Sequence, residues 1–109
     1  MNVMTDLNRN YIAGAWVAGS GEIENHNPSD VSEVVGRYAQ ASAAQLDEAL
    51  SAARKAQAIW AGYGPERRHD VLMAIGTEMM RRAPELGELL SREEGKPLAE
   101  GKGEVYRAG

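Results

Sequence analysis

The chain has 109 residues, a formal net charge of −4 at neutral pH and no cysteine. A chain of this length accommodates one modest domain and has no room for a cofactor domain beside a substrate domain. Without a thiolate, the sequence excludes thiol catalysis and thiolate metal sites. Its acidic pI of about 5.2 argues against a nucleic-acid-binding surface.

The apolar composition predicts a thin core. Leu, Ile and Val together contribute 19 residues and Phe none, whereas Ala contributes 17. Alanine favours helices that pack closely over a thick independent core. Residues 1–10 have no basic patch followed by an apolar run, and no stretch reaches the ~20 apolar residues of a membrane span. We therefore expect a cytoplasmic protein with no membrane partner, whose core depends on further sequence.

Residues 1–41 have the pattern of short strands separated by turns. The β-prone runs alternate with segments that contain Gly, Asn, Pro and Ser, which favour turns. This pattern predicts an antiparallel strand-and-turn region. The runs are residues 11–12, 15–17, 23–25 and 34–38, and the turn segments are 13–14, 19–21 and 27–30.

From Ser42 onward the apolar residues fall at helical spacing. Ser42 and Gln45 form a capping-box pair, which predicts a helix over 43–61. That helix ends at 62–64, where Pro65 is placed to begin a second helix. The apolar face of the first helix comprises Leu46, Ala49, Leu50, Ala53, Ala56 and Trp60, and that of the second comprises Leu72, Ile75, Met79 and Ala83.

Two further helices follow in residues 84–109. Pro84 ends the second helix and begins a third, for which Gly95 is the left-handed cap. Pro97 begins a fourth, which Gly101 and Gly103 weaken by roughly 1 kcal/mol each relative to Ala. We find no linker, low-complexity segment or repeat and predict no domain boundary. The third helix is expected to point Leu86, Leu89 and Leu90 inward.

Few side chains indicate chemistry. His26 and His69 lie far apart in the sequence and lack a metal-ligand spacing, so we interpret both as surface residues. Glu93 and Glu94 are adjacent and diverge by about 100° on a helix, which prevents a facing acid–base pair. They are interpreted as solvated or salt-bridging. Arginine pairs at 67–68 and 81–82 have acidic residues among them, which favours a salt-bridged helix face over a nucleic-acid interface.

The glycine-rich segments do not complete a phosphate-binding motif. Residues 19–21, 62–64 and 101–103 each begin like the dinucleotide fingerprint, but the position of its last glycine is occupied by another residue. We assign these glycines to turns and helix caps. The sequence therefore predicts no catalytic, cofactor-binding or metal-binding residue. The residues at the last fingerprint position are Glu24, Arg67 and Tyr106.

An ordered series of motifs runs from about residue 10 to the end of the chain. Together these motifs resemble the N-terminal region of the aldehyde dehydrogenase superfamily. Gly64, where the family often has a Ser or Thr helix cap, and Gly101, where a helix former is commoner, depart from its pattern. The series consists of Tyr11–Val17, Asn27-Pro28, Val35–Arg37, Ala52–Ala56 with Trp60, Glu66-Arg67 with Leu72, Glu94–Pro97 and Gly103–Val105.

The resemblance implies an α/β parent enzyme with a Rossmann-like domain that binds NAD or NADP. Members oxidise an aldehyde through a Cys nucleophile, hydride transfer and a Glu-activated water. In the family, these groups and the dinucleotide contacts come after the matched region, so none is carried over. Residues 1–109 would be the N-terminal part of the NAD(P)-binding domain, with a strand region at 1–41 and a helical region at 42–109. The catalytic and oligomerisation domains would be absent.

The resemblance also bears on substrate and assembly. The pattern at 94–97 and 100–104 looks most like members that act on semialdehydes, including 2-oxoglutarate semialdehyde. A homo-oligomer, dimer or tetramer, is expected for the full-length enzyme. Because the last helix is still uncapped at Gly109, we expect the reading frame to continue through several hundred residues.

Two alternatives to the hypothesis that the chain is part of an enzyme are open. The first is a free-standing non-catalytic module that binds a partner through the helix at 43–61 and the strand edges. The second is a small helical nucleic-acid-binding protein, which the acidic charge disfavours.

Overall fold

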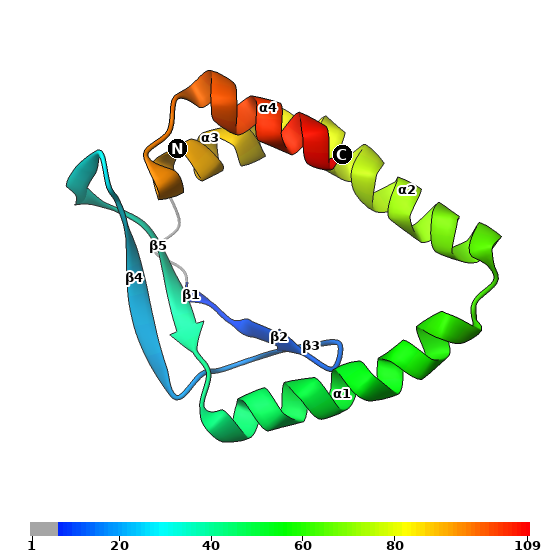
Figure 1. Ribbon diagram of the computed structural model, residues 1–109. Coiled ribbons are helices and arrows are strands. Elements are labelled where there is room, and N and C mark those ends of the chain that lie inside the picture. The colour runs from blue at the N-terminus through cyan, green and yellow to red at the C-terminus, as the bar shows by residue number, and fades with distance from the viewer. Residues whose placement is uncertain (1–6) are drawn as a thin grey trace. The chain divides into compact units, whose positions relative to one another are not determined.

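The computed structural model describes residues 7–109 and places strands before helices, as predicted (Figure 1). This order and the mixed α/β content agree with an N-terminal region of strands followed by helices. The strands are β1 (Leu7–Asn8), β2 (Asn10–Ile12), β3 (Ala15–Val17), β4 (Gly21–Asn27) and β5 (Asp30–Gln40). The helices are α1 (Ala43–Gly62), α2 (Pro65–Arg81), α3 (Ala83–Glu94) and α4 (Leu98–Ala108).

The chain divides into two compact units, whereas the sequence predicted no boundary. One unit comprises Gly36–Tyr63 with the residues up to Asn25, and the other comprises His26–Val35 with Gly64–Gly109. No linker or change of composition marks the boundaries between the two units, because two of these boundaries lie inside β4 and β5. We call these the first unit and the second unit.

In the first unit, β2 and β3 form an antiparallel hairpin with a two-residue turn. Tyr11 lies opposite Trp16 in the register, and their ring centroids are 4.8 Å apart. The turn residues Ala13 and Gly14 have φ angles of +52° and +83°. Positive φ at both central positions is the geometry that matches the twist of the flanking strands. The glycine adopts it freely, whereas the alanine is strained.

The second sheet contains a parallel pairing, through a strand that the sequence analysis did not predict. Its strand order is β1-β5-β4, and β1 runs parallel to β5 with Leu7 opposite Arg37. The Asn8 side chain donates to the Arg37 carbonyl over 3.0 Å. A two-residue strand has no periodicity to read, and its pairing is non-local. The strands β4 and β5 also extend beyond the predicted runs, because backbone pairing continues through their polar residues.

Helix α1 confirms the predicted helix over 43–61, with one change at its cap. The Ser42 hydroxyl accepts from the Gln45 amide at 3.2 Å. The Gln45 side chain does not return to Ser42 but donates to the Ala18 carbonyl at 2.6 Å. Only half of the predicted capping box therefore forms. The other half becomes a link between α1 and the segment after β3.

The breaks between the later helices lie close to the predicted prolines and glycine. Pro65 begins α2 as predicted, and α3 ends at Gly95, whose φ is +71°. The sequence placed Ala83 on the second helix, but α2 stops at Arg81 and Ala83 is the first residue of α3. Proline lacks an amide proton and is best placed in a first turn, so Pro84 sets the start of α3 just before itself.

Glycines, not leucines, form the close contact between α3 and α4 in the second unit. The buried residues of these helices are Ala83, Gly87, Gly101 and Val105. A Cβ at Gly101 would lie 2.5 Å from the Gly87 carbonyl oxygen, and a Cβ at Gly87 would lie 2.8 Å from the Lys102 Cα. The sequence had assigned Gly101 only a weakening effect. Its missing side chain is what permits the two backbones to approach.

Within residues 7–109, the apolar helix faces that were predicted to point inward are largely exposed. Neither α1 nor α2 carries a buried residue. Leu72 is 60% exposed, Ile75 52% and Leu89 37%.

Within residues 7–109, no helix combines the length and the apolar character that crossing a bilayer requires.

Candidate functional site

The two histidines are exposed, as the sequence predicted. His26 lies on β4 with Nδ1 3.1 Å from the Val31 carbonyl oxygen. His69 lies on α2 with Nδ1 3.3 Å from the Asp70 carboxylate. Within residues 7–109, no cluster of three or more His, Cys, Asp or Glu side chains is arranged to hold a metal ion.

The predicted salt-bridging role holds for Glu94. Its carboxylate pairs with Lys96, whose Nζ is also 2.6 Å from Glu104 Oε1. Hydrogen bonds that Lys96 donates to Glu104 and, second in size, to Glu94 raise the pKa of Lys96 above its ordinary value. A nucleophilic lysine needs a lowered pKa. Lys96 is therefore a structural cation that ties the end of α3 to α4.

The arginine pair at 81–82 belongs to a salt-bridged surface, as predicted. Arg81 Nε donates to Glu78 at 2.8 Å, and Arg82 Nε donates to Glu85 at 3.0 Å. Each arginine lowers the pKa of its partner, chiefly through the hydrogen bond. Both pairs join residues three apart in the sequence, which is local stabilisation of helix surface.

The glycine segments do not fit a dinucleotide. A Cβ at Gly19 would lie 2.5 Å from the Gln40 carbonyl oxygen, so this glycine permits a close approach to the backbone at the end of β5. Gly62 ends α1 and Gly64 precedes α2, and Gly101 packs against Gly87. A dinucleotide fingerprint requires three glycines in one strand-to-helix turn. Within residues 7–109, none of the three segments is such a turn, so these segments do not form the fingerprint that binds NAD or NADP.

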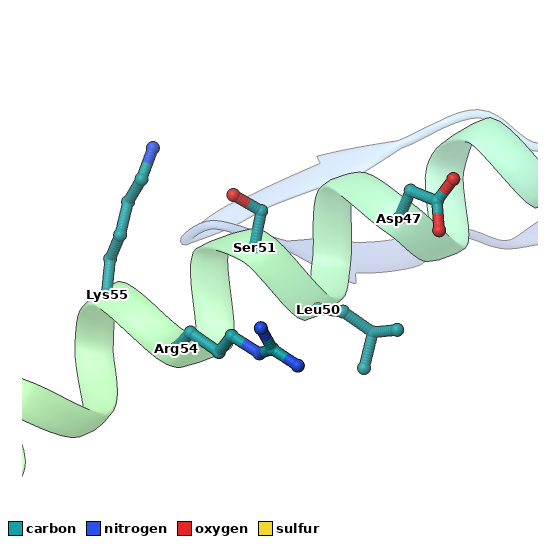
Figure 2. Close-up of a pocket in the computed structure, with 5 residues that line it drawn as sticks. All are labelled: Asp47, Leu50, Ser51, Arg54 and Lys55. Atoms are coloured by element: carbon teal, nitrogen blue, oxygen red, sulfur yellow. The ribbon is translucent and has the colours of Figure 1, made fainter.

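A shallow hollow on α1 is built by a single helix. Figure 2 shows its five lining side chains, which come from successive turns of the helix. Leu50 and Arg54 extend alongside each other, and Lys55 points away from these two. The hollow includes the Ser51 hydroxyl, but a nucleophilic serine needs an adjacent general base and a third group that orients it. The lining residues Asp47, Leu50, Ser51, Arg54 and Lys55 provide no such arrangement.

A second hollow in the first unit is apolar. One wall is the β2–β3 turn at residues 11–14, and the other is a face of α1 with small side chains. Tyr11 and Ile59 at its rim are 62% and 61% exposed. The small side chains leave the helix backbone accessible to a close neighbour. The α1 residues are Ala49, Ala52, Ala53, Lys55, Ala56 and Ile59.

A connected polar cluster at the tip of the β4–β5 hairpin was missed by the sequence analysis. Glu33 accepts from Asn27 Nδ2 at 2.7 Å and from Arg92 Nε at 2.9 Å. The Asn27 hydrogen bond, followed by that of Arg92, lowers the pKa of Glu33. Because Arg92 is 59 residues away in the sequence, no local pattern joins it to Glu33. Only Asn27 had been singled out, as part of a motif.

The comparisons with known proteins agree with this fold. The protein-family model described as "Aldehyde dehydrogenase family" matches residues 16–109 of the sequence. The α-ketoglutarate semialdehyde dehydrogenase of Haloferax volcanii is 42% identical over 108 residues, which are 96% of this chain and 22% of that protein. The N-succinylglutamate 5-semialdehyde dehydrogenase of Chromobacterium violaceum is 42% identical over 97 residues, 87% of this chain and 20% of that protein.

Solved structures match as well. A 1-pyrroline-5-carboxylate dehydrogenase variant from Thermus thermophilus aligns with a TM-score of 0.87 and 37% identity, over 92% of this chain and 19% of that one. An NAD-dependent aldehyde dehydrogenase from Sinorhizobium meliloti aligns with a TM-score of 0.87 and 28% identity, over 95% and 22%. The chain thus spans about a fifth of the length of the curated relatives described above. On the family match over most of its residues, the chain belongs to the aldehyde dehydrogenase family.

Proposed function

We propose that the chain is the N-terminal part of the NAD(P)-binding domain of an NAD- or NADP-dependent aldehyde dehydrogenase that oxidises a semialdehyde to the carboxylate. The observation that carries this proposal is the 42% identity with two semialdehyde dehydrogenases, across 96% and 87% of the chain. Both relatives are about five times as long as the matched region, which leaves ample sequence for a catalytic domain.

In this proposal the 109 residues provide scaffold and not chemistry. The sequence contains no cysteine for covalent addition to the carbonyl. Within residues 7–109, Gly19 lies close to the end of β5, Gly62 and Gly64 lie at helix ends, and Gly101 lies where α3 and α4 pack together. Bound NAD(P) supplies hydride acceptance, and the residues that hold it are assigned to sequence other than these. The homo-oligomer and the cytoplasmic location expected from the sequence stay predictions.

The substrate class follows from the names of the two relatives. α-Ketoglutarate semialdehyde and N-succinylglutamate 5-semialdehyde each carry a carboxylate at a distance from the aldehyde. We therefore propose an aldehyde with a remote carboxylate as the substrate of the parent enzyme. Which of the two is preferred depends on a pocket that these residues do not contain.

The test is to express the protein encoded by the complete reading frame and to follow NAD(P)H formation with each semialdehyde. Pentanal, which has the aldehyde without the carboxylate, is the matched comparison. We expect kcat/KM at least tenfold higher for one of the semialdehydes, and no reduction by residues 1–109 alone. A stop codon after Gly109 in an intact gene, or a complete protein inert with all aldehydes, would overturn the proposal and favour the non-catalytic interaction module.

A further inference from the structure

The second unit is assembled from two segments that are far apart in the sequence. The hairpin tip at 26–35 and the helices at 64–109 belong to it together. Two strands joined by a tight turn are marginally stable in water on their own. Contacts with the helices therefore add to the order that the tip has from strand pairing.

One such contact is the Glu33 carboxylate, which is shared between the two segments. Its Oε2 accepts from Asn27 within the tip at 2.7 Å, and its Oε1 accepts from Arg92 on α3 at 2.9 Å. The Arg92 and Glu33 side chains are 20% and 35% exposed. A charged hydrogen bond in this partly desolvated position is stronger than one in open solvent. Breaking it separates the two charges, although Glu33 keeps its hydrogen bond from Asn27.

A steric contact lies beside this ion pair. Gly95 ends α3 with φ of +71°, and a Cβ there would lie 2.8 Å from Pro28 Cγ and 3.0 Å from Ser29 Oγ. The Asn27 side chain accepts from the Ser29 amide at 2.9 Å, which fixes the shape of the turn that meets Gly95. Asn27 thus holds both the turn and the carboxylate. The motifs Asn27-Pro28 and Glu94–Pro97, distant in sequence, meet at this point.

We propose that Asn27, Pro28, Glu33, Arg92 and Gly95 form a conformational clasp, which makes the hairpin tip and α3 open and close as one cooperative unit. The clasp would allow neither segment to lose its order alone, since each side supplies half of the contacts. Local openings of this kind set the rates of amide hydrogen exchange. The proposal is independent of the activity of the parent enzyme.

The Arg81–Glu78 pair provides a matched comparison. It lies in the same unit and has the same chemistry, but its side chains are 68% and 52% exposed and three residues apart. An exposed pair within one helix contributes little and connects no second segment. Arg92→Met and Arg81→Met therefore remove the same charge and differ in whether the clasp is broken.

The experiment is hydrogen exchange with mass spectrometry on the intact protein and on these two variants. Peptides covering 26–35, 83–95 and 43–62 are compared. We expect Arg92→Met to speed exchange by about tenfold or more in both 26–35 and 83–95, and by similar factors. Arg81→Met should leave 26–35 within about twofold of the wild type. Peptides of 43–62 report whether the remainder of the fold is intact.

Two outcomes would overturn the proposal. In the first, Arg92→Met accelerates exchange in only one of the two segments. In the second, Arg81→Met accelerates both segments as much as Arg92→Met does. If Arg92→Met does not fold, Arg92→Lys serves instead, because it keeps the charge but loses the planar donor pair. A smaller acceleration shared by both segments would then support the clasp, and an unchanged tip would contradict it.

Discussion

Two glycines of α4 have opposite surroundings although one residue separates them. Gly101 is buried against Gly87, and a Cβ there would meet the Gly87 carbonyl oxygen at 2.5 Å. Gly103 has nothing within 4 Å of the position of its missing Cβ. Helix propensity favours alanine at both positions equally. Packing therefore decides which glycine is required.

We predict that Gly103→Ala raises the free energy of unfolding by roughly 0.5–1 kcal/mol. Gly101→Ala should lower it, because overpacking costs about 1–3 kcal/mol and exceeds the gain in propensity. Denaturant titration of the two variants beside the wild type measures both changes. Equal stabilisation by the two substitutions would show that α3 and α4 do not approach as closely as described.

Ala13 has a backbone conformation that an alanine adopts at a cost. Its φ of +52° places it in the left-handed region at the β2–β3 turn. Asparagine tolerates this region and is preferred in such turns, whereas a β-branched residue does not tolerate it. We predict that Ala13→Asn stabilises the protein by about 1 kcal/mol and that Ala13→Val destabilises it. Thermal unfolding of the two variants measures the order of their stabilities. That order would be reversed if residue 13 had a negative φ.

At the scale of elements, the hairpin tip should respond to acid. The Asn27 hydrogen bond and the Arg92 contact hold the pKa of Glu33 below its ordinary value of 4.5, against the opposing effects of desolvation and, more weakly, of the nearby Asp30. A lowered folded-state pKa contributes stability that is present above the ordinary value and is lost as the pH falls below it. The contribution should therefore disappear as the pH is lowered from about 4.5.

The measurement is the free energy of unfolding of wild type and Glu33→Gln between pH 7 and pH 3. Other carboxylates titrate in both proteins, so the difference between them isolates Glu33. We expect a difference at neutral pH that shrinks below the ordinary glutamate value. A difference that stays constant over the whole range would mean that the Glu33 charge does not stabilise the tip.

The helices could be predicted from the sequence because their ends depend on neighbouring residues. Ser42 caps α1, Pro65 begins α2 and Gly95 ends α3, and each acts within one turn of its own position. The sheet could not be predicted equally well. Its β1–β5 pairing joins Leu7 to Arg37, and two residues carry no periodicity that would indicate a partner so far along the chain.

For the candidate site, the sequence analysis could address only features that do not depend on the fold. The lack of cysteine and the incomplete glycine fingerprints can be read directly, and neither depends on the fold. The Glu33–Arg92 contact joins residues from β5 and α3, and neither residue belongs to a recognisable local motif. Gly101 was interpreted by propensity alone because its neighbour Gly87 comes from another helix.

At the scale of the whole molecule, many large apolar side chains are exposed. Val31 is 75% exposed, Leu72 60% and Ile75 52%. Exposed apolar patches beyond a few hundred Å² are uncommon on isolated soluble proteins. We predict that residues 1–109 alone bind a hydrophobic dye and self-associate. Dye fluorescence and light scattering test this against the protein from the complete reading frame.

The control is Leu72→Gln with Ile75→Gln, which should reduce dye binding while circular dichroism retains its helical signal. A sharp thermal transition from a monomer that binds no dye would contradict the prediction.

The chain passes between its two units three times, after Asn25, Val35 and Tyr63. In a chimera made with a relative, a crossover anywhere between residues 26 and 63 mixes parental sequences in both units at once. In both units, residues in contact are then inherited from different parents. A crossover before or after that span mixes parental sequences in only one unit. In shuffled libraries, the fraction of folded members should therefore be lowest when the crossover lies inside residues 26–63, whatever the length of the segment exchanged.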